Sequence, residues 1–337
     1  MTVDSLARST AYAGVAAGTV AGLVWGLAFL VPVVIYEWNP VIVTGSRYIA
    51  YGTVACVILL IRGRAVLQMA WRHWPTAVLY AIAGNVGYFL LLVIGIHTVG
   101  APVTDMIIGC IPLTLAAVSN YLSPAYPWRR LVLPFGLVLA GLATVNALEI
   151  AGSHPYIQTS VGLKLGGLLA TFGAVATWTW YGLANTRFLA EHRNVSPAAW
   201  STTVGAATGV VTLASLPLAW ATHQITAPPD PALSSVITLA AGATVLGVVV
   251  SFGGTWLWNA ASRRLTATVA GLLINVETVA GFGYVYAARQ ELPPPGQLIG
   301  FCLILAGVAL VVLRLGAGGT VRRPALESVE CLTLSRN

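Results

Sequence analysis

Residues 265–291, LTATVAGLLINVETVAGFGYVYAARQE, decide the fold class of this chain. The segment has the length of a membrane-spanning helix and carries Asn275, Glu277 and Thr278 near its middle. A carboxylate in hydrocarbon is costly unless it is paired, solvated or protonated. The stretch therefore predicts a transmembrane helix whose acid has a definite physical role.

The composition extends this interpretation to the whole chain. Hydrophobic residues make up 57% of the 337 residues and charged residues 8%, about a third of the share in soluble domains. We predict an all-helical, multi-pass membrane protein with ten spans, each near the ~20 residues that cross a bilayer. Their approximate bounds are 13–36, 40–61, 75–96, 101–122, 130–150, 162–187, 197–220, 234–257, 265–288 and 296–315.

The basic residues predict the orientation and exclude nucleic acid as a partner. With the first span starting inside, arginines collect in the inner loops and termini, and only Arg289 falls in an outer loop. By the positive-inside rule both termini are cytoplasmic. The net charge of +7 thus reflects membrane topology rather than a nucleic-acid surface. The inner arginines are Arg8, Arg62, Arg64, Arg72, Arg129, Arg130, Arg187, Arg193, Arg263, Arg264, Arg314, Arg322, Arg323 and Arg336.

The even number of spans suggests two halves. We assign residues 1–150 to a first five-helix repeat, 151–315 to a second, and 316–337 to a flexible cytoplasmic tail. Ile111-Pro112 in the fourth span is a weak echo of Glu277-Thr278 in the ninth. Five spans per half invert the second repeat, a design of transporters with a site near the midplane.

Small residues mark one face of the first span. Gly14, Gly18, Gly22 and Gly26 recur every four residues, so another helix can approach closely. Tight packing explains such a face, and a sliding surface for alternating access is the sharper alternative.

Charged residues within spans have alternative interpretations. Glu277 could exchange a proton in each transport cycle, or it could be a fixed structural group bonded to Asn275. Asp105, near the outer face, could attract an amino group or simply reach water. Arg47 could bind an anionic group, pair with an acid or snorkel outward. Lys164 is interfacial.

Aromatic residues lie deeper than the usual interfacial belts. A cavity lined by such rings would suit flat or cationic solutes, whereas belt or lipid-facing positions account for the others. Asn85 and Asn259 add amide groups. The deep aromatic residues are Trp25, Tyr88, Trp178, Trp180, Tyr181, Trp256, Trp258 and Tyr284.

Motifs for catalysis, metals and cofactors are missing from the sequence. None of the patterns HExxH, GxSxG or GxxxxGK[ST] occurs, and the four cysteines are too scattered for a zinc site. We expect no enzyme, no metal and no cofactor. Any pumping must then draw on an ion or solute gradient.

The order of several short motifs resembles the drug/metabolite transporter superfamily, in particular its ten-helix EamA-type members. The matching motifs are Trp25-Gly26, Arg47, Trp258-Asn259, Arg263-Arg264-Leu265, Val276-Glu277-Thr278, Glu291 and the closing helix from Gly296. The resemblance implies a basket of two inverted repeats, with a cavity built from helices 1, 3, 4, 6, 8 and 9. Thr278 occupies a position where the family has proline, which leaves open whether the ninth helix is kinked.

Within the family, the aromatic amino-acid exporters look nearest, since Tyr88 and Trp178 to Tyr181 fall where they carry cavity aromatics. We therefore expect an alternating-access exporter of small amphipathic metabolites, foremost amino acids, in the bacterial inner membrane. A multidrug exporter of cationic compounds, a channel-like facilitator and a membrane scaffold are the alternatives. Proton coupling and a monomer or homodimer fit this expectation. The predicted substrate-binding residues are Trp25, Asn85, Tyr88, Asp105, Trp178, Tyr181, Trp258, Asn275 and Glu277.

Overall fold

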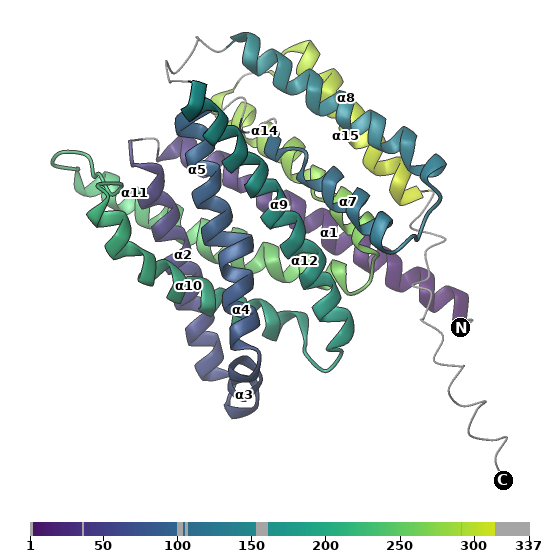
Figure 1. Ribbon diagram of the computed structural model, residues 1–337, viewed down its shortest axis with the longest axis horizontal. Coiled ribbons are helices and arrows are strands. Elements are labelled where there is room, and N and C mark those ends of the chain that lie inside the picture. Colours follow the sequence, from purple (N-terminus) through teal and green to yellow (C-terminus); the bar gives the residue numbers. More distant parts are fainter. Residues whose placement is uncertain are drawn as a thin grey trace.

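A computed structural model describes residues 3–35, 37–99, 104, 107–152, 161–290 and 292–313, and within these ranges every regular element is a helix (Figure 1). In the first half these are α1 (Val3–Val34), α2 (Pro40–Ile61), α3 (Arg64–Arg72), α4 (Trp74–Ala81), the π-helix η1 (Ile82–Val86), α5 (Gly87–Val99), α7 (Ile111–Leu122) and α8 (Trp128–Gly152). In the second half they are α9 (Val161–Glu191), α10 (Pro197–Ala221), α11 (Leu233–Thr244), the π-helix η2 (Val245–Gly253), α12 (Gly254–Ser262), α13 (Ala267–Leu273), α14 (Asn275–Arg289) and α15 (Pro295–Val311).

Seven of the predicted spans are helical segments long and apolar enough to cross a membrane. They are Ser9–Val31, Val41–Ile61, Trp74–Ile96, Val161–Glu191, Pro197–Ala221, Leu233–Ser262 and Ala267–Ala288. The other three predicted intervals contain α7, α8 and α15. The predicted tail, 316–337, lies outside the described residues.

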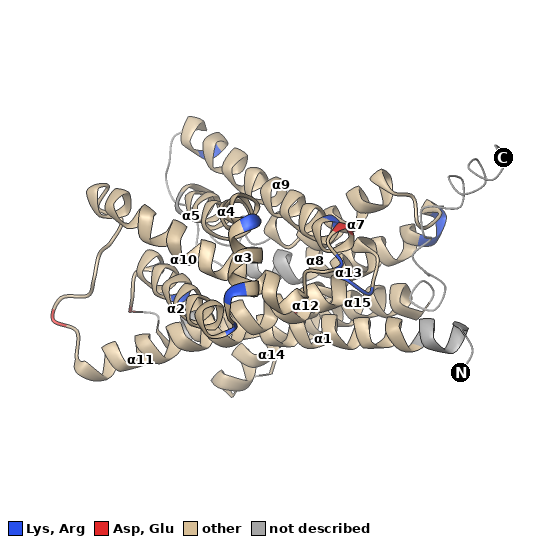
Figure 2. Ribbon diagram, turned by 90° about the horizontal axis from the view of Figure 1, so that it is seen from below, with Lys and Arg blue, Asp and Glu red and all other residues tan. Residues whose placement is uncertain are grey.

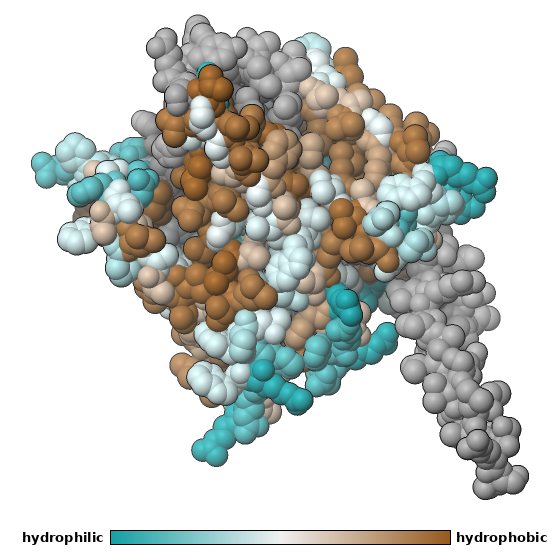
Figure 3. All heavy atoms as spheres, viewed as in Figure 1, coloured by the Kyte–Doolittle hydropathy of each residue, from teal (hydrophilic) through white to brown (hydrophobic). Residues whose placement is uncertain are grey.

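The described surface has the character expected in lipid. On α9, Leu163, Leu169 and Phe172 are 57%, 65% and 57% exposed, which would be unfavourable over such an area in water. Figure 3 shows hydrophobic residues over much of the visible face and hydrophilic ones near its ends. The chain is a multi-pass membrane protein.

Local sequence sets where several helices begin. Asn39 accepts a hydrogen bond from the Val41 N–H and precedes Pro40, which needs no donor partner at the first helical position. Ser196 caps α10 in the same way, with Pro197 after it, and Thr266 caps α13. The predicted inner loop after residue 61 instead forms the short helix α3, whose Val66 and Ala70 pack near Leu59.

Loops predicted on the inner side lie together. Arg263, before α13, donates to the carbonyl oxygens of Arg193 and Val195, between α9 and α10. His73, before α4, contacts His192 at a ring-centroid distance of 4.9 Å. Figure 2 marks the basic residues in blue. Three basic loops are therefore neighbours at one end of the bundle.

Loops predicted on the outer side also meet one another. The Trp38 indole N–H donates to Ser235 Oγ at 2.9 Å, and the Asn39 amide donates to Thr226 Oγ1 at 2.8 Å. These bonds join the connection after α1 to the first turn of α11 and to the loop that precedes it. The alternation predicted from charge thus matches the observed grouping of loops.

Helix pairing follows a regular scheme. α8 packs along α15, as Figure 1 shows, α2 packs along α10, and α7 packs on α13. In the predicted numbering these pairs join span 5 with 10, 2 with 7, and 4 with 9. In addition, α1 packs on α12 and α5 packs on α9, so span 1 meets 8 and span 3 meets 6.

The ninth span is interrupted even though Thr278 replaces proline. α13 ends at Leu273, and the Glu277 N–H donates to the Ile274 carbonyl at 2.9 Å as α14 begins. The Asn275 side chain donates to the Leu272 carbonyl at 2.9 Å. An asparagine at the break can bond locally to the backbone, which favours interruption without proline. Glu277 consequently lies in the first turn of α14.

The glycine face of α1 packs against the ninth span. A Cβ added at Gly22 would lie 2.8 Å from Val276 Cβ, and one added at Gly26 would lie 2.8 Å from Ala280 Cβ. α1 and α14 can approach this closely only because these positions lack side chains. The glycine spacing therefore sets the distance between the first span and the helix that carries Glu277.

Candidate functional site

Four predicted site residues form one aromatic cluster centred on Trp258. Its ring centroid lies 6.2 Å from that of Trp25, 5.9 Å from Trp178 and 6.1 Å from Tyr181. Trp178 and Tyr181 are 5.9 Å apart. The rings come from α1, α9 and α12, and they meet in tilted and edge geometries that are favourable for aromatic pairs. The cluster therefore joins both halves of the chain.

Two glycines make room for these rings. The Trp25 indole lies where a side chain at Gly254 would stand, one turn before Trp258. At Gly84 in η1, an added Cβ would lie 2.6 Å from the Tyr181 ring. Any larger residue at either position would displace an aromatic side chain of the cluster.

The remaining predicted residues of the first half lie beside this cluster or outside the described residues. Tyr88 on α5 packs with Trp178 against a small apolar group that includes Ile111. Asn85, in η1, donates to Thr208 Oγ1 on α10 at 3.0 Å. π-helical segments widen a helix locally and are frequent at functional sites. Asp105 lies outside the described residues.

A buried chain of hydrogen bonds begins at the residue after Trp258. The Trp200 indole N–H donates to Asn185 Oδ1 at 2.7 Å, and Asn185 Nδ2 donates to Asn259 Oδ1 at 2.7 Å. Asn259 Nδ2 then donates to Ser201 Oγ at 2.8 Å. This chain ties α9, α10 and α12 together beneath the aromatic cluster. The sequence did not identify Asn185 and Ser201 as neighbours of the site. The position of Asn185 deep in the predicted sixth span was nevertheless a signal that could have indicated it.

Trp258 Nε1 is a buried polar atom of the cluster with no hydrogen-bond partner among the described residues. Thr179 Oγ1 on α9 and Asn275 Oδ1 on α14 also lack a partner within that part of the chain. Buried polar groups normally find partners, because an unsatisfied one costs free energy. A donor at the centre of four aromatic rings suits a solute that carries both apolar and polar groups.

Arg47 and Glu277, the charged residues predicted within the second and ninth spans, form no ion pair with each other. Arg47 Nε donates to Ser251 Oγ in η2 at 2.9 Å, and the guanidinium carbon lies 5.4 Å from the Tyr48 ring centroid. The Glu277 backbone nitrogen would lie 3.1 Å from a Cβ added at Gly22, one turn from Trp25 on α1. Arg47, whose role the sequence left open, is thus held by a hydrogen bond to the eighth span.

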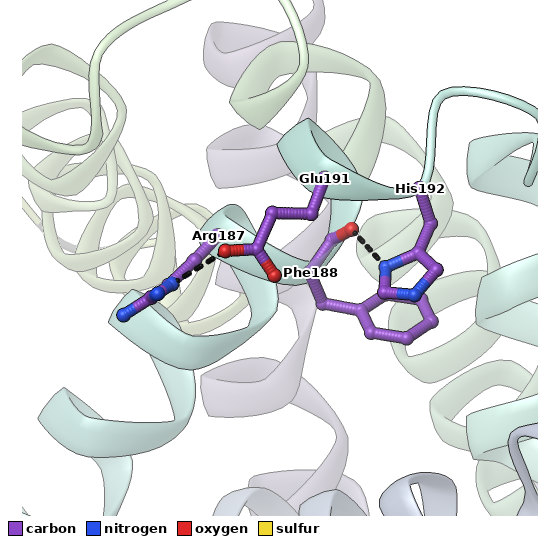
Figure 4. A network of polar contacts seen from close by, with 4 residues as sticks. All are labelled: Arg187, Phe188, Glu191 and His192. Atoms are coloured by element: carbon purple, nitrogen blue, oxygen red, sulfur yellow. Dashed lines mark hydrogen bonds and ion pairs between the residues drawn. The ribbon is translucent and has the colours of Figure 1, made fainter.

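The end of the bundle that carries the basic loops has a second aromatic group, which includes two histidines. Phe188 stacks on Trp200 at 3.9 Å, and His192 Nδ1 donates to the Phe188 carbonyl at 3.0 Å (Figure 4). Burial lowers the pKa of His73 below its usual value, and the nearby charges of His192 and Arg72 lower it further. Figure 4 also shows the surface ion pair of Arg187 with Glu191, 2.7 Å long.

The described residues contain no group of three or more His, Cys, Asp or Glu side chains that could hold a metal ion. Cys56 and Cys302 are free thiols. The candidate site therefore offers aromatic rings and amide groups, together with the carboxylate of Glu277.

Comparison with known proteins agrees with this architecture. Residues 165–313 match the model of the EamA-like transporter family. The chain is 32% identical over 308 residues to the inner membrane protein YtfF of Escherichia coli, covering 89% of this chain and 94% of that protein. A crystal structure with 19% sequence identity superposes with a TM-score of 0.69 over 92% of this chain and 97% of the other, which shows likeness of fold alone.

Proposed function

The chain belongs to the EamA-like transporter family of the drug/metabolite transporter superfamily, and from this premise we propose that it exports small amphipathic metabolites, foremost amino acids. The family is one of membrane transporters rather than enzymes. Export proceeds by alternating access, in which the two halves of the chain rock about a central site.

The aromatic cluster around Trp258 is the observation that carries this proposal. Its four rings come from both halves, and Trp258 Nε1 is a donor with no partner among the described residues. Aromatic faces bind flat or cationic groups, while an indole N–H orients a polar group. An amino acid with an apolar side chain presents both kinds of group. Trp25, Asn85, Tyr88, Trp178, Tyr181, Trp258, Asn275 and Glu277 form the proposed binding site, and Asp105, which lies outside the described residues, is included from the sequence alone.

Two inverted five-helix repeats, 1–150 and 151–315, account for the helix pairing. Under a two-fold relation between the halves, each span packs on its equivalent in the other half, or two spans exchange partners across the axis. The observed pairs of spans 2 with 7, 4 with 9 and 5 with 10 follow the first pattern. π-helices η1 and η2 interrupt the third and eighth spans, which are equivalent under this relation. A turn before α7 in the fourth span corresponds to the interruption at Ile274 in the ninth.

Orientation and energy source complete the proposal. The end that carries the basic loops faces the cytoplasm. The membrane is the bacterial inner membrane, which is the location given in the name of the Escherichia coli relative YtfF. A proton gradient drives transport through Glu277, the acid in the first turn of α14. The unit of function is a monomer or a homodimer.

Trp178→Ala tests the site against a matched neighbour. We expect counterflow of labelled amino acids in proteoliposomes to fall by about tenfold, because an aromatic contact and its apolar area are lost. Trp256→Ala is the control, since Trp256 is 46% exposed on the lipid side of α12. Equal effects of the two substitutions would contradict the proposed site. Absence of counterflow in the wild type, with downhill flux retained, would favour a channel-like facilitator.

A panel of cationic drugs in the same assay separates the substrate classes. Drug counterflow without amino-acid counterflow would favour the multidrug alternative. Neither flux, in a protein that folds, would favour a scaffold.

A further inference from the structure

The short helix α3, between the second and third predicted spans, has an apolar surface that only partly packs on the protein. Val66 and Ala70, one turn apart, pack against the hydrophobic cluster formed by α2 and α10. Leu67 and Trp71, also one turn apart, point to a neighbouring side of the helix and are 43% and 76% exposed. The apolar surface of α3 therefore continues beyond the bundle.

The remaining side of α3 is basic and polar. Arg64, Gln68 and Arg72 recur every four residues and are exposed, and exposed Arg62 directly precedes the helix. None of these three arginines forms an ion pair within the part of the chain that the structure describes. Figure 2 shows basic residues in blue at both ends of α3. The helix thus presents unpaired positive charge beside an exposed apolar strip.

The position of α3 places both surfaces at the boundary between lipid and water. The helix connects the span Val41–Ile61 to the span Trp74–Ile96, and Figure 1 shows it end-on beneath α2 and α4, so that its axis crosses theirs. The Trp71 ring stacks on that of Trp74, at the start of the third span, with centroids 6.5 Å apart. Tryptophan is enriched at this boundary, because its ring is apolar while its N–H is polar.

This combination of surfaces selects an anionic lipid as the partner. Exposed leucine and tryptophan side chains are unfavourable in water but favourable among the first methylene groups of a lipid. Guanidinium groups donate paired hydrogen bonds to phosphate oxygens, and unpaired arginines beside a bilayer favour negatively charged headgroups. A purely zwitterionic lipid would satisfy the apolar strip and leave the net positive charge uncompensated.

We propose that α3 is a membrane-surface helix that binds an anionic phospholipid. Leu67 and Trp71 insert at the edge of the bundle, while Arg64 and Arg72 hold the lipid phosphate. Through the stack of Trp71 on Trp74, the bound lipid supports the start of the third span. The proposal goes beyond the proposed function, because it does not depend on which solute the chain moves.

Spin labels measure the depth of the two sides of α3. In the full-length protein without its native cysteines, Leu67→Cys and Gln68→Cys place nitroxides one residue apart on different sides of the helix. The vesicles contain phosphatidylcholine and phosphatidylglycerol. We expect the label at 67 to collide more with oxygen, which concentrates in hydrocarbon, and the label at 68 to collide more with a water-soluble nickel complex. Equal access of the nickel complex to both labels would place α3 in water and overturn the proposal.

Native mass spectrometry of the purified protein tests the charge preference. With phosphatidylglycerol and phosphatidylcholine as competing probes, we expect the wild type to retain phosphatidylglycerol preferentially. An arginine near an anionic surface contributes about fivefold, so the double variant Arg64→Gln/Arg72→Gln should lose at least tenfold of this preference. Trp71→Ala should weaken the retention of both lipids, because it removes the apolar contact.

The matched control is Arg129→Gln/Arg130→Gln, which removes the same number of exposed arginines from another predicted inner loop. Equal losses of preference in the two double variants would show that the whole basic end attracts lipid without a site on α3, and would overturn the proposal. Strong dipolar broadening between labels at 67 would place a second copy of the chain on this surface and would also overturn it. An unchanged melting temperature of Arg64→Gln/Arg72→Gln in detergent separates lost lipid binding from unfolding.

Discussion

Trp258 and Asn259 are adjacent in sequence but differ in how their polar atoms are satisfied. Asn259 makes buried hydrogen bonds to Asn185 and Ser201, whereas Trp258 Nε1 has no partner among the described residues. In a bilayer an unsatisfied polar group finds no water to bond, so a satisfied asparagine stabilises the bundle and an unsatisfied indole favours a ligand. In the proposed site, a structural polar group and a proposed ligand-binding group are therefore adjacent in sequence.

His73 provides a residue-scale prediction of pH dependence. Its pKa lies below the usual 6.5 in the folded protein, because burial disfavours the charged ring and His192 and Arg72 repel it. As the pH falls below 6.5, His73 in the unfolded chain binds a proton more readily than His73 in the folded protein. The free energy of unfolding therefore decreases on acidification. His73→Gln should reduce the loss of melting temperature between about pH 7.5 and about pH 5.5.

Thermal unfolding in detergent at several pH values measures this effect. His223→Gln is the control, because His223 is exposed in the loop after α10. If His73→Gln leaves the wild-type pH slope unchanged, the inner histidine cluster does not couple to folding.

At the scale of elements, the contact of α1 with α14 has the greatest functional consequence. The glycine face of α1 fixes the depth and direction of Glu277, whose backbone nitrogen would lie 3.1 Å from a Cβ added at Gly22. Small-residue faces permit close backbone approach, and in this molecule that approach sets the geometry of the proposed site.

Gly22→Ala should destabilise the protein by about 1–3 kcal/mol and lower transport, because the new methyl group overlaps Val276. Gly45→Ala is the matched control, since a Cβ at Gly45 in α2 meets nothing within 4 Å. Replacing an unhindered helical glycine by alanine is neutral or stabilising by up to ~1 kcal/mol. Melting temperature and counterflow should separate the two variants, and similar results for both would contradict the packing argument.

At the scale of the whole molecule, loops of one kind gather at one end. Arg263 bonds to the loop at Arg193, while Trp38 and Asn39 bond to the region around Ser235 and Thr226 at the other. From the positive-inside rule we propose that the basic end faces the cytoplasm.

Cysteine labelling of intact cells checks this orientation. In a background without native cysteines, Asp230→Cys should react with a membrane-impermeant maleimide, whereas Asn194→Cys should react only after the cells are opened. The reverse pattern would invert the proposed topology.

The membrane class, the positions of seven spans and the family membership followed from the sequence, because hydropathy over ~20 residues reports directly on the bilayer. The aromatic residues of the cluster could also be named in advance, since deep Trp and Tyr are unusual in spans. Family motifs ordered along the chain identified the EamA-like transporters before any contact was known.

Tertiary structure decided which polar groups meet. Arg47 and Ser251 are 204 positions apart, and no local pattern shows that their side chains form a hydrogen bond. The interruption at Ile274 likewise did not need the proline expected at Thr278, because a local backbone bond from Asn275 accompanies it. Sequence fixes the cost of each residue in lipid, whereas only packing determines which distant partner offsets that cost.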